Sequence, residues 1–424
     1  MLETTYEERR RLESLDSNEL TKLQLDKLNA LLSTILPHNT FYASKLSGIE
    51  LPLRSLADLD RLPYTFKDEL ICNGSDGDFS KNLTYPIEQY NRFHRTSGTR
   101  GYALVVLDSD SDWRWWIDTW QFVLDAAELT PRDRVFMAFS FGPFIGFWSA
   151  FDAAIARGCL VIPGGGLSTL ARLDTIRNNA VTAICCTPTY ALHLVEVAAE
   201  NDIKLASFDV RRIIVAGEPG GSLPAVRERI ESAWNAKVID HGGASEIGPW
   251  GYADEQQRGL HIVESEFIAE FLSVESGKPA GEGELAELVL TTLGRAGSPV
   301  IRYRTGDLVR PSWNATNANR FVLLEGGVLG RTDDMMIIRG VNIFPSSIEQ
   351  ILHSFPEVIE YRITATKAGE MDALRIEVED RLHESARIAQ ELELRLGLRI
   401  AIADVPIGSL PRFEAKGKRF VDQR

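Results

Sequence analysis

Residues 211–243 have the sequence RRIIVAGEPGGSLPAVRERIESAWNAKVIDHGG, in which two short apolar runs flank an amphipathic segment. The runs RRIIVAG and KVIDHGG are β-rich and bounded by glycines, which is typical of buried strands. The segment between them, SLPAVRERIESAWN, carries apolar residues at helical spacing. A strand, a helix and a second strand in this order predict parallel strands joined by a crossover helix.

The same alternation extends upstream to about residue 130. Three more apolar runs, each followed by an amphipathic segment, precede it: VFMAFSF with FWSAFDAAIARG, CLVIP with STLARLDTIRNN, and TAICCTP with TYALHLVEVAAEN. These pairs predict an α/β domain with parallel sheets and crossover helices. We interpret the adjacent Cys185 and Cys186 as small buried hydrophobes on a strand. The four cysteines lack C-x-x-C spacing, so we expect no zinc.

The chain on either side of this alternation has a different character. Roughly the first ninety residues are polar, with leucines at helical spacing. From about residue 264 the sequence becomes strand-rich, which predicts an antiparallel or barrel-like part packed on the main body. After a break at LEGGVLGRTDD, the order helix, two strands, helix and strand predicts a small α+β domain. We therefore divide the chain into a large N-terminal domain, residues 1–330, and a small mobile C-terminal domain, residues 331–424.

The bulk properties exclude some classes of function. The chain has 424 residues and a formal net charge of -14, whereas nucleic-acid binders are more often basic. The charged N-terminus lacks the apolar core of a secretory signal, and no stretch reaches the roughly 18 apolar residues of a membrane helix. We expect a cytoplasmic protein that binds neither nucleic acid nor a membrane.

Small and hydroxyl-bearing residues follow five successive predicted strands, in FSFGPFIG, IPGGG, CCTPTY, AGEPGGS and HGGASE. Ligands of parallel sheets bind beyond the carboxyl ends of the strands, and small residues let a ligand approach the backbone closely. Turns have a similar composition, so one such segment is weak evidence. Five in succession favour a ligand site along this edge.

The segment RTSGTRG, residues 95–101, has the composition of a phosphate-binding loop. Its glycines permit backbone angles at which successive N–H groups converge on an anion, and its hydroxyls and arginines add donors and charge. The spacing of a Walker A loop is absent. A hairpin turn rich in serine, threonine and glycine has the same composition, so these residues alone leave both interpretations open.

Three charged motifs follow in the second half of the chain. Asp307, in IRYRTGDLVR, could accept hydrogen bonds from two ribose hydroxyls or belong to an ordinary turn. Asp333 and Asp334, in GRTDD, lie where the two domains meet and form either a hinge or a plain linker. Lys416 and Lys418, in LPRFEAKGKRF, follow the last predicted strand, where solvated surface lysines are the ordinary case.

In this order, the motifs resemble those of the adenylate-forming superfamily, and most closely its phenylacetate–CoA ligase branch. Family members carry S/T-S-G-T-T-G, Y-x-x-[ST]-E, Y-R-T-x-D, G-R-x-D-D with R-G-x-N-[IV]-F-P, and L/I-P-R-x-E-x-K. This chain has TSGTRG, HGGASE, YRTGD, GRTDD-MMIIRGVNIFP and LPRFEAK. The resemblance spans nearly the whole chain and implies ATP-dependent activation of a small acid to acyl-AMP, followed by transfer to a thiol.

The resemblance also implies a role for each matching residue. In it, Lys416 bridges the substrate carboxylate and the α-phosphate, Ser245 faces that phosphate, Glu246 holds Mg²⁺ and Asp333 is the hinge. The loop would bind the β- and γ-phosphates, the segment after residue 216 would border adenine, and Asp307 would bind ribose. The implied nucleotide-binding residues are Thr96, Ser97, Gly98, Thr99, Arg100, Gly101, Gly217, Glu218, Pro219, His241, Gly242, Asp307 and Arg331. The implied substrate pocket consists of Phe141, Gly142, Phe144, Ala216, Gly243 and Ala244.

Two positions depart from the family pattern. Arg100 replaces the second threonine of the phosphate loop, where it either tightens or crowds phosphate binding. Gly242 replaces the aromatic residue that stacks on adenine in relatives. The loss of that ring predicts weaker nucleotide binding, unless His241 or another ring takes its place. Lys418 also follows a glycine, as in other branches, but the spacing from LPR favours Lys416 as the catalytic lysine.

The pocket segment FSFGPFIGFW is aromatic and has no fixed charge, which predicts a flat aryl acid, with or without amino or hydroxyl groups. The branch implies coenzyme A as the thiol acceptor, and the phosphopantetheine arm of an acyl carrier protein is the alternative. Two further alternatives are transfer of the acyl group to an amine or alcohol, and a non-catalytic nucleotide-binding relative. The departures at Arg100 and Gly242 favour the non-catalytic interpretation. The retained Glu246, Asp307, Asp333 and Lys416 oppose it.

Overall fold

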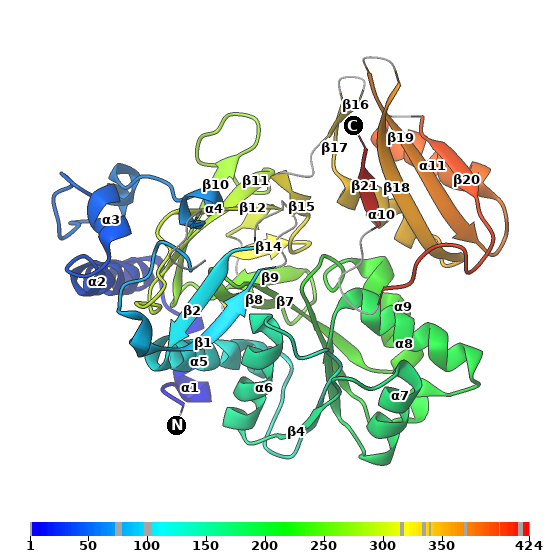
Figure 1. The fold of residues 1–424 in the computed structure, drawn as a ribbon, viewed down its shortest axis with the longest axis horizontal. Coiled ribbons are helices and arrows are strands. Elements are labelled where there is room, and N and C mark those ends of the chain that lie inside the picture. The colour runs from blue at the N-terminus through cyan, green and yellow to red at the C-terminus, as the bar shows by residue number, and fades with distance from the viewer. Residues whose placement is uncertain are drawn as a thin grey trace.

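The computed structural model describes residues 2–72, 79–96, 103–313, 318–332, 336–338, 341–368, 371–397, 399–413 and 419–423. Figure 1 shows a large domain, coloured blue to yellow, and a smaller orange-to-red domain that lies above helices α8 and α9. Among the described residues, no helix has both the length and the apolar character needed to cross a membrane.

The predicted parallel sheet is confirmed, and it forms the centre of the large domain. Strands β3, β5, β6 and β7 pair in parallel, and β4 adds the edge next to β3. The strands are β3 (Arg134–Met137), β4 (Leu160–Pro163), β5 (Ala183–Cys186), β6 (Arg212–Ala216) and β7 (Lys237–Ala244). The crossover helices are α6 (Ile145–Arg157), α7 (Thr169–Asn178), α8 (Pro188–Glu200) and α9 (Pro224–Trp234). Cys185 and Cys186 are buried on β5, as the sequence predicts.

The strand-rich part divides between two sheets. Strands β8, β9, β14 and β13 continue the parallel sheet in antiparallel fashion, giving nine strands in the order β13-β14-β9-β8-β7-β6-β5-β3-β4. A separate antiparallel sheet has the order β10-β11-β12-β15. The bounds are β8 (Gly248–Ala253), β9 (Gly259–Ile262), β10 (Phe267–Ser273), β11 (Ala286–Thr292), β12 (Tyr303–Val309), β13 (Pro311–Ser312), β14 (Leu323–Glu325) and β15 (Gly330–Arg331). The run NRFVLLEG therefore joins the main sheet, because Leu323 and Leu324 pair with β9.

The predicted N-terminal helices are present, and short 3-10 turns connect them. Their bounds are α1 (Tyr6–Glu13), α2 (Ser17–Ile35), α3 (Thr40–Lys45), α4 (Lys67–Leu70), η1 (Leu56–Arg61) and η2 (Ile87–Gln89), with η3 (Leu205–Ser207) further along. Capping boxes at Thr5 and Asp16 begin α1 and α2. Leu28, Leu31 and Ile35 form the apolar stripe of α2 and are buried in one cluster with residues of the antiparallel sheet.

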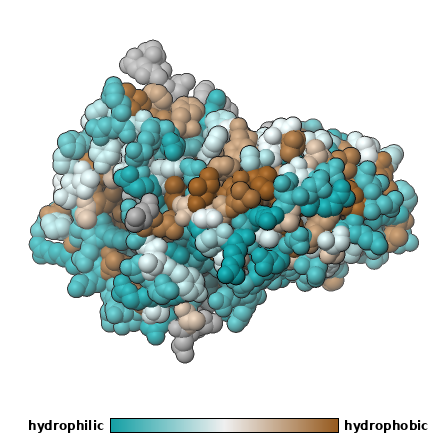
Figure 2. All heavy atoms as spheres, turned by 90° about the horizontal axis from the view of Figure 1, so that it is seen from below, coloured by the Kyte–Doolittle hydropathy of each residue, from teal (hydrophilic) through white to brown (hydrophobic). Residues whose placement is uncertain are grey.

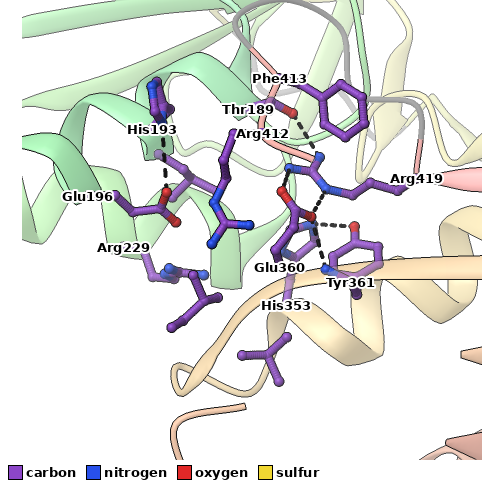
Figure 3. A pocket seen from close by; sticks show the side chains of 13 residues that line it. Thr189, His193, Glu196, Arg229, His353, Glu360, Tyr361, Arg412, Phe413 and Arg419 are labelled. Atoms are coloured by element: carbon purple, nitrogen blue, oxygen red, sulfur yellow. Dashed lines mark hydrogen bonds and ion pairs between the residues drawn. The ribbon is translucent and has the colours of Figure 1, made fainter. Parts of the chain in front are cut away.

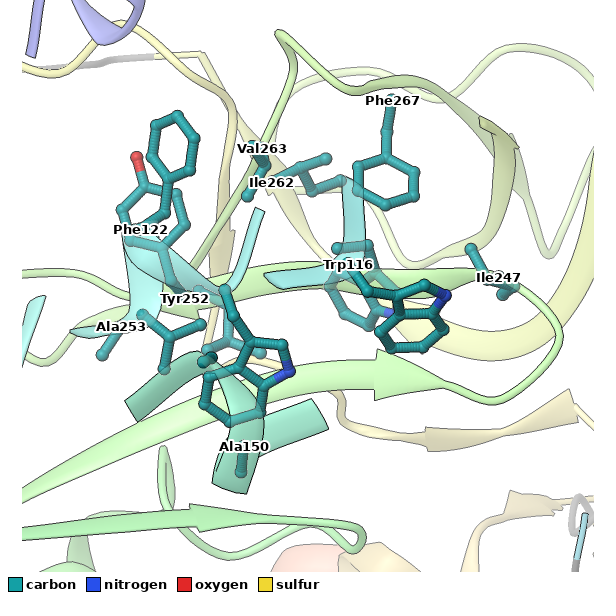
Figure 4. Close-up of a cluster of buried hydrophobic side chains, with 14 of the residues drawn as sticks. Trp116, Phe122, Ala150, Ile247, Tyr252, Ala253, Ile262, Val263 and Phe267 are labelled. Atoms are coloured by element: carbon teal, nitrogen blue, oxygen red, sulfur yellow. The ribbon is translucent and has the colours of Figure 1, made fainter. Parts of the chain in front are cut away.

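A tryptophan-rich helix that the sequence pattern does not reveal lies between the two sheets. The hairpin of β1 (Tyr90–Arg95) and β2 (Val105–Ser109) leads into α5 (Asp110–Ala126). Most residues of helix α5 are buried, and these include the polar Asp112, Gln121 and Asp125, so its polar residues do not all mark the exposed side. Figure 4 shows Trp116 and Phe122 of this helix among Tyr252, Phe267 and other buried side chains. These contacts hold α5 against β8, beside the ligand edge of the sheet.

The C-terminal domain has the predicted order of helix, two strands, helix and strand, with its own core. Its elements are β16 (Met336–Ile338), β17 (Val341–Ile343), α10 (Pro345–His353), β18 (Val358–Ala368), β19 (Met371–Asp380), α11 (Ser385–Leu396), β20 (Ala401–Asp404) and β21 (Phe420–Asp422). The final strand β21, which the sequence does not suggest, pairs in parallel with β18. Figure 1 shows β21 in dark red next to the C-terminus.

Exposed apolar side chains gather on the face of the molecule that is seen from below in Figure 2, where hydrophilic side chains surround them. Helix α6 and the edge strand β4 lie low in Figure 1, and each exposes a large apolar residue to solvent, Ile155 and Leu160 respectively.

Candidate active site

A cavity of about 1430 Å³ lies at the carboxyl ends of β5, β6 and β7. Residues of the antiparallel sheet and of β21 from the small domain also border it. This is the edge at which ligands of parallel sheets bind. The cavity thus lies where the succession of glycine-rich strand ends predicts a ligand site.

The cavity brings together most of the predicted site residues that the structure describes. Those that line it are Thr96, Phe144, Ala216, Gly217, Glu218, Pro219, His241, Gly242, Gly243, Ala244, Ser245, Glu246, Asp307 and Arg331. Seven predicted residues lie outside the described part of the chain: Ser97, Gly98, Thr99, Arg100, Gly101, Asp333 and Lys416. Their roles stay predictions.

Phe141 and Gly142, which the resemblance places in the acid pocket, are not among the described residues that line the cavity. The ring of Phe141 instead packs edge-on against Trp148 and Phe151 of α6. The carbonyl of Gly142 accepts a hydrogen bond from Trp148 Nε1 at 2.9 Å. The loop between β3 and α6 therefore turns these two residues toward its own helix.

Glu246 lies between a cation and a phenol. Its Oε1 atom accepts a hydrogen bond from Tyr303 Oη at 3.0 Å and is 3.2 Å from Lys67 Nζ. Burial raises the pKa of this carboxyl, but the Lys67 ammonium and hydrogen bonds outweigh it and hold the pKa below its usual value. The side chain is 11% exposed, so the charge faces the cavity rather than bulk solvent. The site therefore presents a permanent carboxylate to a ligand.

Sequence reasoning missed Lys67 and Tyr303. Lys67 begins the short helix α4, in a part of the chain that carries no recognisable motif. Tyr303 is the first letter of YRTGD, and its aromatic character alone suggests a core residue. Only the packing of the N-terminal segment on the antiparallel sheet, seen in the pairing of Thr65 with Tyr303, brings both side chains to Glu246.

Asp307 and Arg331 face each other on adjacent strands near the junction of the domains. They are paired in register on β12 and β15, and Arg331 Nη1 donates to Asp307 Oδ1 at 2.9 Å. Gly306 has a φ of +76°, and a Cβ there would lie 2.9 Å from Arg331 Nη2. The turn thus requires glycine both for its backbone angle and for the close approach of the guanidinium.

The loop after β6 forms another wall of the cavity. Glu218 Oε1 accepts a hydrogen bond from the backbone N–H of Thr189 at 2.7 Å, which ties this loop to the start of α8. Asp240 hydrogen-bonds to Ser222, and burial raises its pKa to about 6. These contacts fix the segment that the family resemblance places beside adenine.

The indole of Trp250 fills the space beside Gly242. A Cβ at residue 242 would lie 2.7 Å from the Trp250 ring, which is 1% exposed and lines the cavity. Trp250 lies on β8, which pairs with β7 at this point. A ring from the neighbouring strand thus stands where relatives carry an aromatic residue on β7 itself. This explains why residue 242 is a glycine.

Gly242→Ala is expected to destabilise the large domain by about 1–3 kcal/mol, because the new methyl group overpacks against a buried indole. The midpoint of urea unfolding, followed by tryptophan fluorescence, measures the change. Gly281→Ala is the matched control, since the nearest atom to its Cβ would be the flexible end of Glu284 at 3.8 Å. An unchanged midpoint for Gly242→Ala would mean that Trp250 moves aside freely.

The small domain contacts the large domain through Arg419. Its guanidinium hydrogen-bonds to both carboxylate oxygens of Glu360 within the small domain, at 2.5 and 3.0 Å. It also donates to Thr189 Oγ1 on α8 at 3.0 Å (Figure 3). Because Thr189 also binds Glu218, a short chain of hydrogen bonds links the cavity wall to the small domain. Arg419 directly follows the segment 414–418, which contains Lys416.

Comparisons with known proteins agree with this geometry. Residues 340–424 match the model of the AMP-binding enzyme C-terminal domain. The chain is 33% identical to phenylacetate-coenzyme A ligase of Escherichia coli, over 97% of each chain. It is 30% identical to the enzyme of the same name from Thermus thermophilus, over 97% of this chain and 98% of the relative. The fold and the site thus define an adenylate-forming enzyme. The chain belongs to the family of phenylacetate–coenzyme A ligases, which are AMP-forming acid–thiol ligases.

One solved relative also indicates which domain arrangement is seen here. The chain is 27% identical to a 2-hydroxyisobutyryl-CoA ligase in its postadenylation state with 2-HIB-AMP, covering 98% of this chain and 92% of that one, with a TM-score of 0.90. The same enzyme in its thioesterification state gives 0.73, over 99% and 93% of the chains at 26% identity. The present arrangement of the domains is therefore closer to the postadenylation state.

Proposed function

We propose that this enzyme activates an aryl acid with ATP and transfers the acyl group to coenzyme A. The observation that carries this proposal is that one cavity brings a carboxylate, Glu246, together with the aromatic side chains of Trp116, Trp120 and Phe144. The carboxylate suits the adenylation step, which involves the charged phosphates of ATP. The aromatic side chains suit a flat acid.

The first step joins two anions. An oxygen of the substrate carboxylate attacks the α-phosphorus of ATP, a P–O bond forms, and pyrophosphate leaves to give acyl-AMP. Positive charge aimed at the reacting oxygens lowers the barrier of such a step. We assign this charge to Lys67, which reaches Glu246 from α4, and to Lys416 on the segment before Arg419.

Glu246 fits the role of a Mg²⁺ ligand, because protein Mg²⁺ sites commonly use one or two carboxylates plus substrate phosphates. When bound, the ion would neutralise phosphate charge. We assign the ribose hydroxyls to Asp307, oriented by Arg331, and the adenine to the wall formed by Gly217, Glu218 and Trp250. Ser245 would face the α-phosphate, and residues 96–101 would hold the terminal phosphates.

In the second step the sulfur of coenzyme A attacks the acyl carbonyl carbon, AMP leaves, and the thiol proton is lost to solvent. We propose that the small domain rotates between the steps, with residues 1–330 as the fixed part, residues 331–424 as the moving part and a hinge near Asp333. The difference in similarity between two states of one relative supports such a rotation. In the arrangement seen here, Phe420 and Asp422 of the small domain border the cavity.

The test of the proposal is acid-dependent exchange of labelled pyrophosphate into ATP, across benzoates, hydroxy- and aminobenzoates, arylacetates and fatty acids. Exchange that depends on one class of aryl acid is the expected result. Product analysis with coenzyme A, a phosphopantetheinylated carrier protein or an amine then identifies the acceptor. Failure of every acid, with a folded protein that binds ATP, would favour the non-catalytic alternative.

Thr189→Val is expected to slow acyl-AMP formation more than transfer to coenzyme A, because it removes the hydroxyl that accepts from Arg419 in the present domain arrangement. Since one hydrogen bond to a charged group contributes about 1.5–3 kcal/mol, the first step should slow by roughly tenfold or more. Separate pre-steady-state measurements of the two steps provide the comparison. Thr182→Val, which alters a hydroxyl at the start of β5 that bonds to Asp133, is the control. Equal slowing of both steps would contradict the proposed function of this contact.

A further inference from the structure

His241 on β7 has a defined tautomer. Its Nδ1 atom is 2.7 Å from the carbonyl oxygen of Gly251. A carbonyl oxygen can only accept, so Nδ1 carries the proton and donates it. Burial lowers the pKa of this histidine to about 4, so the ring is neutral at physiological pH. In a neutral imidazole the other nitrogen, Nε2, is then a hydrogen-bond acceptor.

The Nε2 atom faces the cavity wall formed by the end of β7. A Cβ at Gly243 would lie 3.1 Å from this nitrogen, and Gly243 and His241 both line the cavity. Within the part of the chain that the structure describes, Nε2 has no hydrogen-bond partner. The ring itself is 7% exposed and lies 4.3 Å from that of Trp120, on the side of helices α5 and α6.

Two indole donors of the cavity wall, those of Trp116 and Trp120, already donate to other groups. Trp120 Nε1 donates to Ser149 Oγ at 3.0 Å, and that hydroxyl donates in turn to the carbonyl of Gly146. Trp116 Nε1 donates to Asp108. Trp250 Nε1, on the neighbouring strand, is a buried donor that bonds neither to His241 nor to any other described residue. The indoles of Trp116 and Trp120 therefore leave His241 Nε2 as an acceptor that they do not satisfy. Displacing water from such a nitrogen without replacing its hydrogen bond is costly.

We infer that His241 Nε2 accepts a hydrogen bond from a hydroxyl or amino substituent of the substrate acid, so that the enzyme selects hydroxylated or aminated aryl acids over unsubstituted ones. This inference rests on the proposed function and narrows its substrate class. It moves His241 from the nucleotide side, where the family resemblance places it, to the acid side of the cavity. Sites built to bond a substrate O–H or N–H discriminate strongly against analogues that lack it.

Pyrophosphate exchange with matched acids tests the inference on the unaltered enzyme. At each ring position, kcat/KM is measured for the hydroxy-, the amino- and the fluorobenzoate. The three values are compared with one another and with that for unsubstituted benzoate. Fluorine is close in size to a hydroxyl but cannot donate. At one ring position at least, we expect kcat/KM for the hydroxybenzoate or the aminobenzoate to exceed kcat/KM for the fluorobenzoate by roughly 10–100-fold. Whichever of the hydroxy and amino compounds has the higher kcat/KM identifies the donor as O–H or N–H.

The variants His241→Phe and His241→Gln distinguish the effect of the hydrogen-bond acceptor on substrate preference from the effect of the shape of the pocket. The phenylalanine variant keeps a ring and removes the acceptor, so the ratio of kcat/KM for the hydroxy or amino compound to kcat/KM for the fluoro compound should fall to near one, whatever happens to the overall rate. The glutamine variant keeps an acceptor oxygen and should retain part of the preference. Exchange with aryl acids but no preference for a donor at any position would overturn this inference and leave the proposed function standing. Absence of exchange with every acid would overturn both.

Discussion

Lys416→Ala is expected to lower the rate of acyl-AMP formation by about a hundredfold or more, while thiolysis of supplied acyl-AMP by coenzyme A stays largely unchanged. Removing one group that stabilises charge in a transition state commonly costs this much. The asymmetry follows from the proposed rotation, in which this lysine leaves the reacting atoms before the thiol arrives. Pyrophosphate exchange measures the first step, and thioester formation from synthetic acyl-AMP measures the second.

The described neighbours of Lys416 support its assignment to the first step. Arg419, the first described residue after segment 414–418, binds Glu360 of the small domain and Thr189 of the large domain. Phe420, the next residue, borders the cavity. The described residues that directly follow the segment with the lysine therefore lie beside the cavity in the postadenylation-like arrangement.

Lys418→Ala is the matched control, because it removes the same charge from the same segment. We expect its exchange rate to remain close to that of the unaltered enzyme. If Lys418→Ala abolishes exchange and Lys416→Ala does not, the assignment based on the spacing from LPR is wrong and Lys418 is the catalytic lysine. Equal loss of both steps in Lys416→Ala would contradict the idea that the lysine serves only one of them.

The sequence predicts the parallel sheet well because its determinants are local. Each strand from β3 to β6 is a short apolar run followed by an amphipathic helix, and the handedness and pairing of such units vary little. Cys185 and Cys186 illustrate this, since an apolar run between two turns suffices to place them on a buried strand. The small domain is predicted for the same reason, apart from β21.

The elements that escape prediction depend on tertiary contacts. Helix α5 buries polar as well as apolar residues, because strands of two sheets and helix α6 pack against it. The ring of Trp250, on the neighbouring strand, fills the space beside Gly242. From the sequence alone, the glycine suggests that the aromatic ring is lost, although another strand supplies one. Lys67 reaches Glu246 from the N-terminal segment, and nothing in its own stretch of sequence marks it. Motifs identify residues that act at fixed spacings, but not partners supplied by packing.

Glu246→Gln is expected to lower pyrophosphate exchange by about a hundredfold or more and to raise the Mg²⁺ concentration needed for half-maximal rate. The change keeps the shape of the side chain but removes the negative charge that faces Lys67 and, in our proposal, the metal. Loss of a preorganised charge at the reacting phosphates accounts for an effect of this size. Exchange rates over a range of Mg²⁺ concentrations provide the measurement, and urea unfolding verifies that the variant is folded.

Tyr303→Phe distinguishes the effect of the negative charge of Glu246 from the effect of the hydrogen bond that this carboxylate accepts. This variant removes the hydrogen bond from Tyr303 Oη to Glu246 Oε1 but leaves the carboxylate and Lys67 in place. One such bond contributes about 1.5–3 kcal/mol when its acceptor is charged, so the exchange rate should fall by at most about a hundredfold, with little change in the Mg²⁺ requirement. If both variants lose rate equally and neither changes the Mg²⁺ dependence, Glu246 acts by holding Tyr303 and Lys67 in position, and the metal ligand must be sought elsewhere around the cavity.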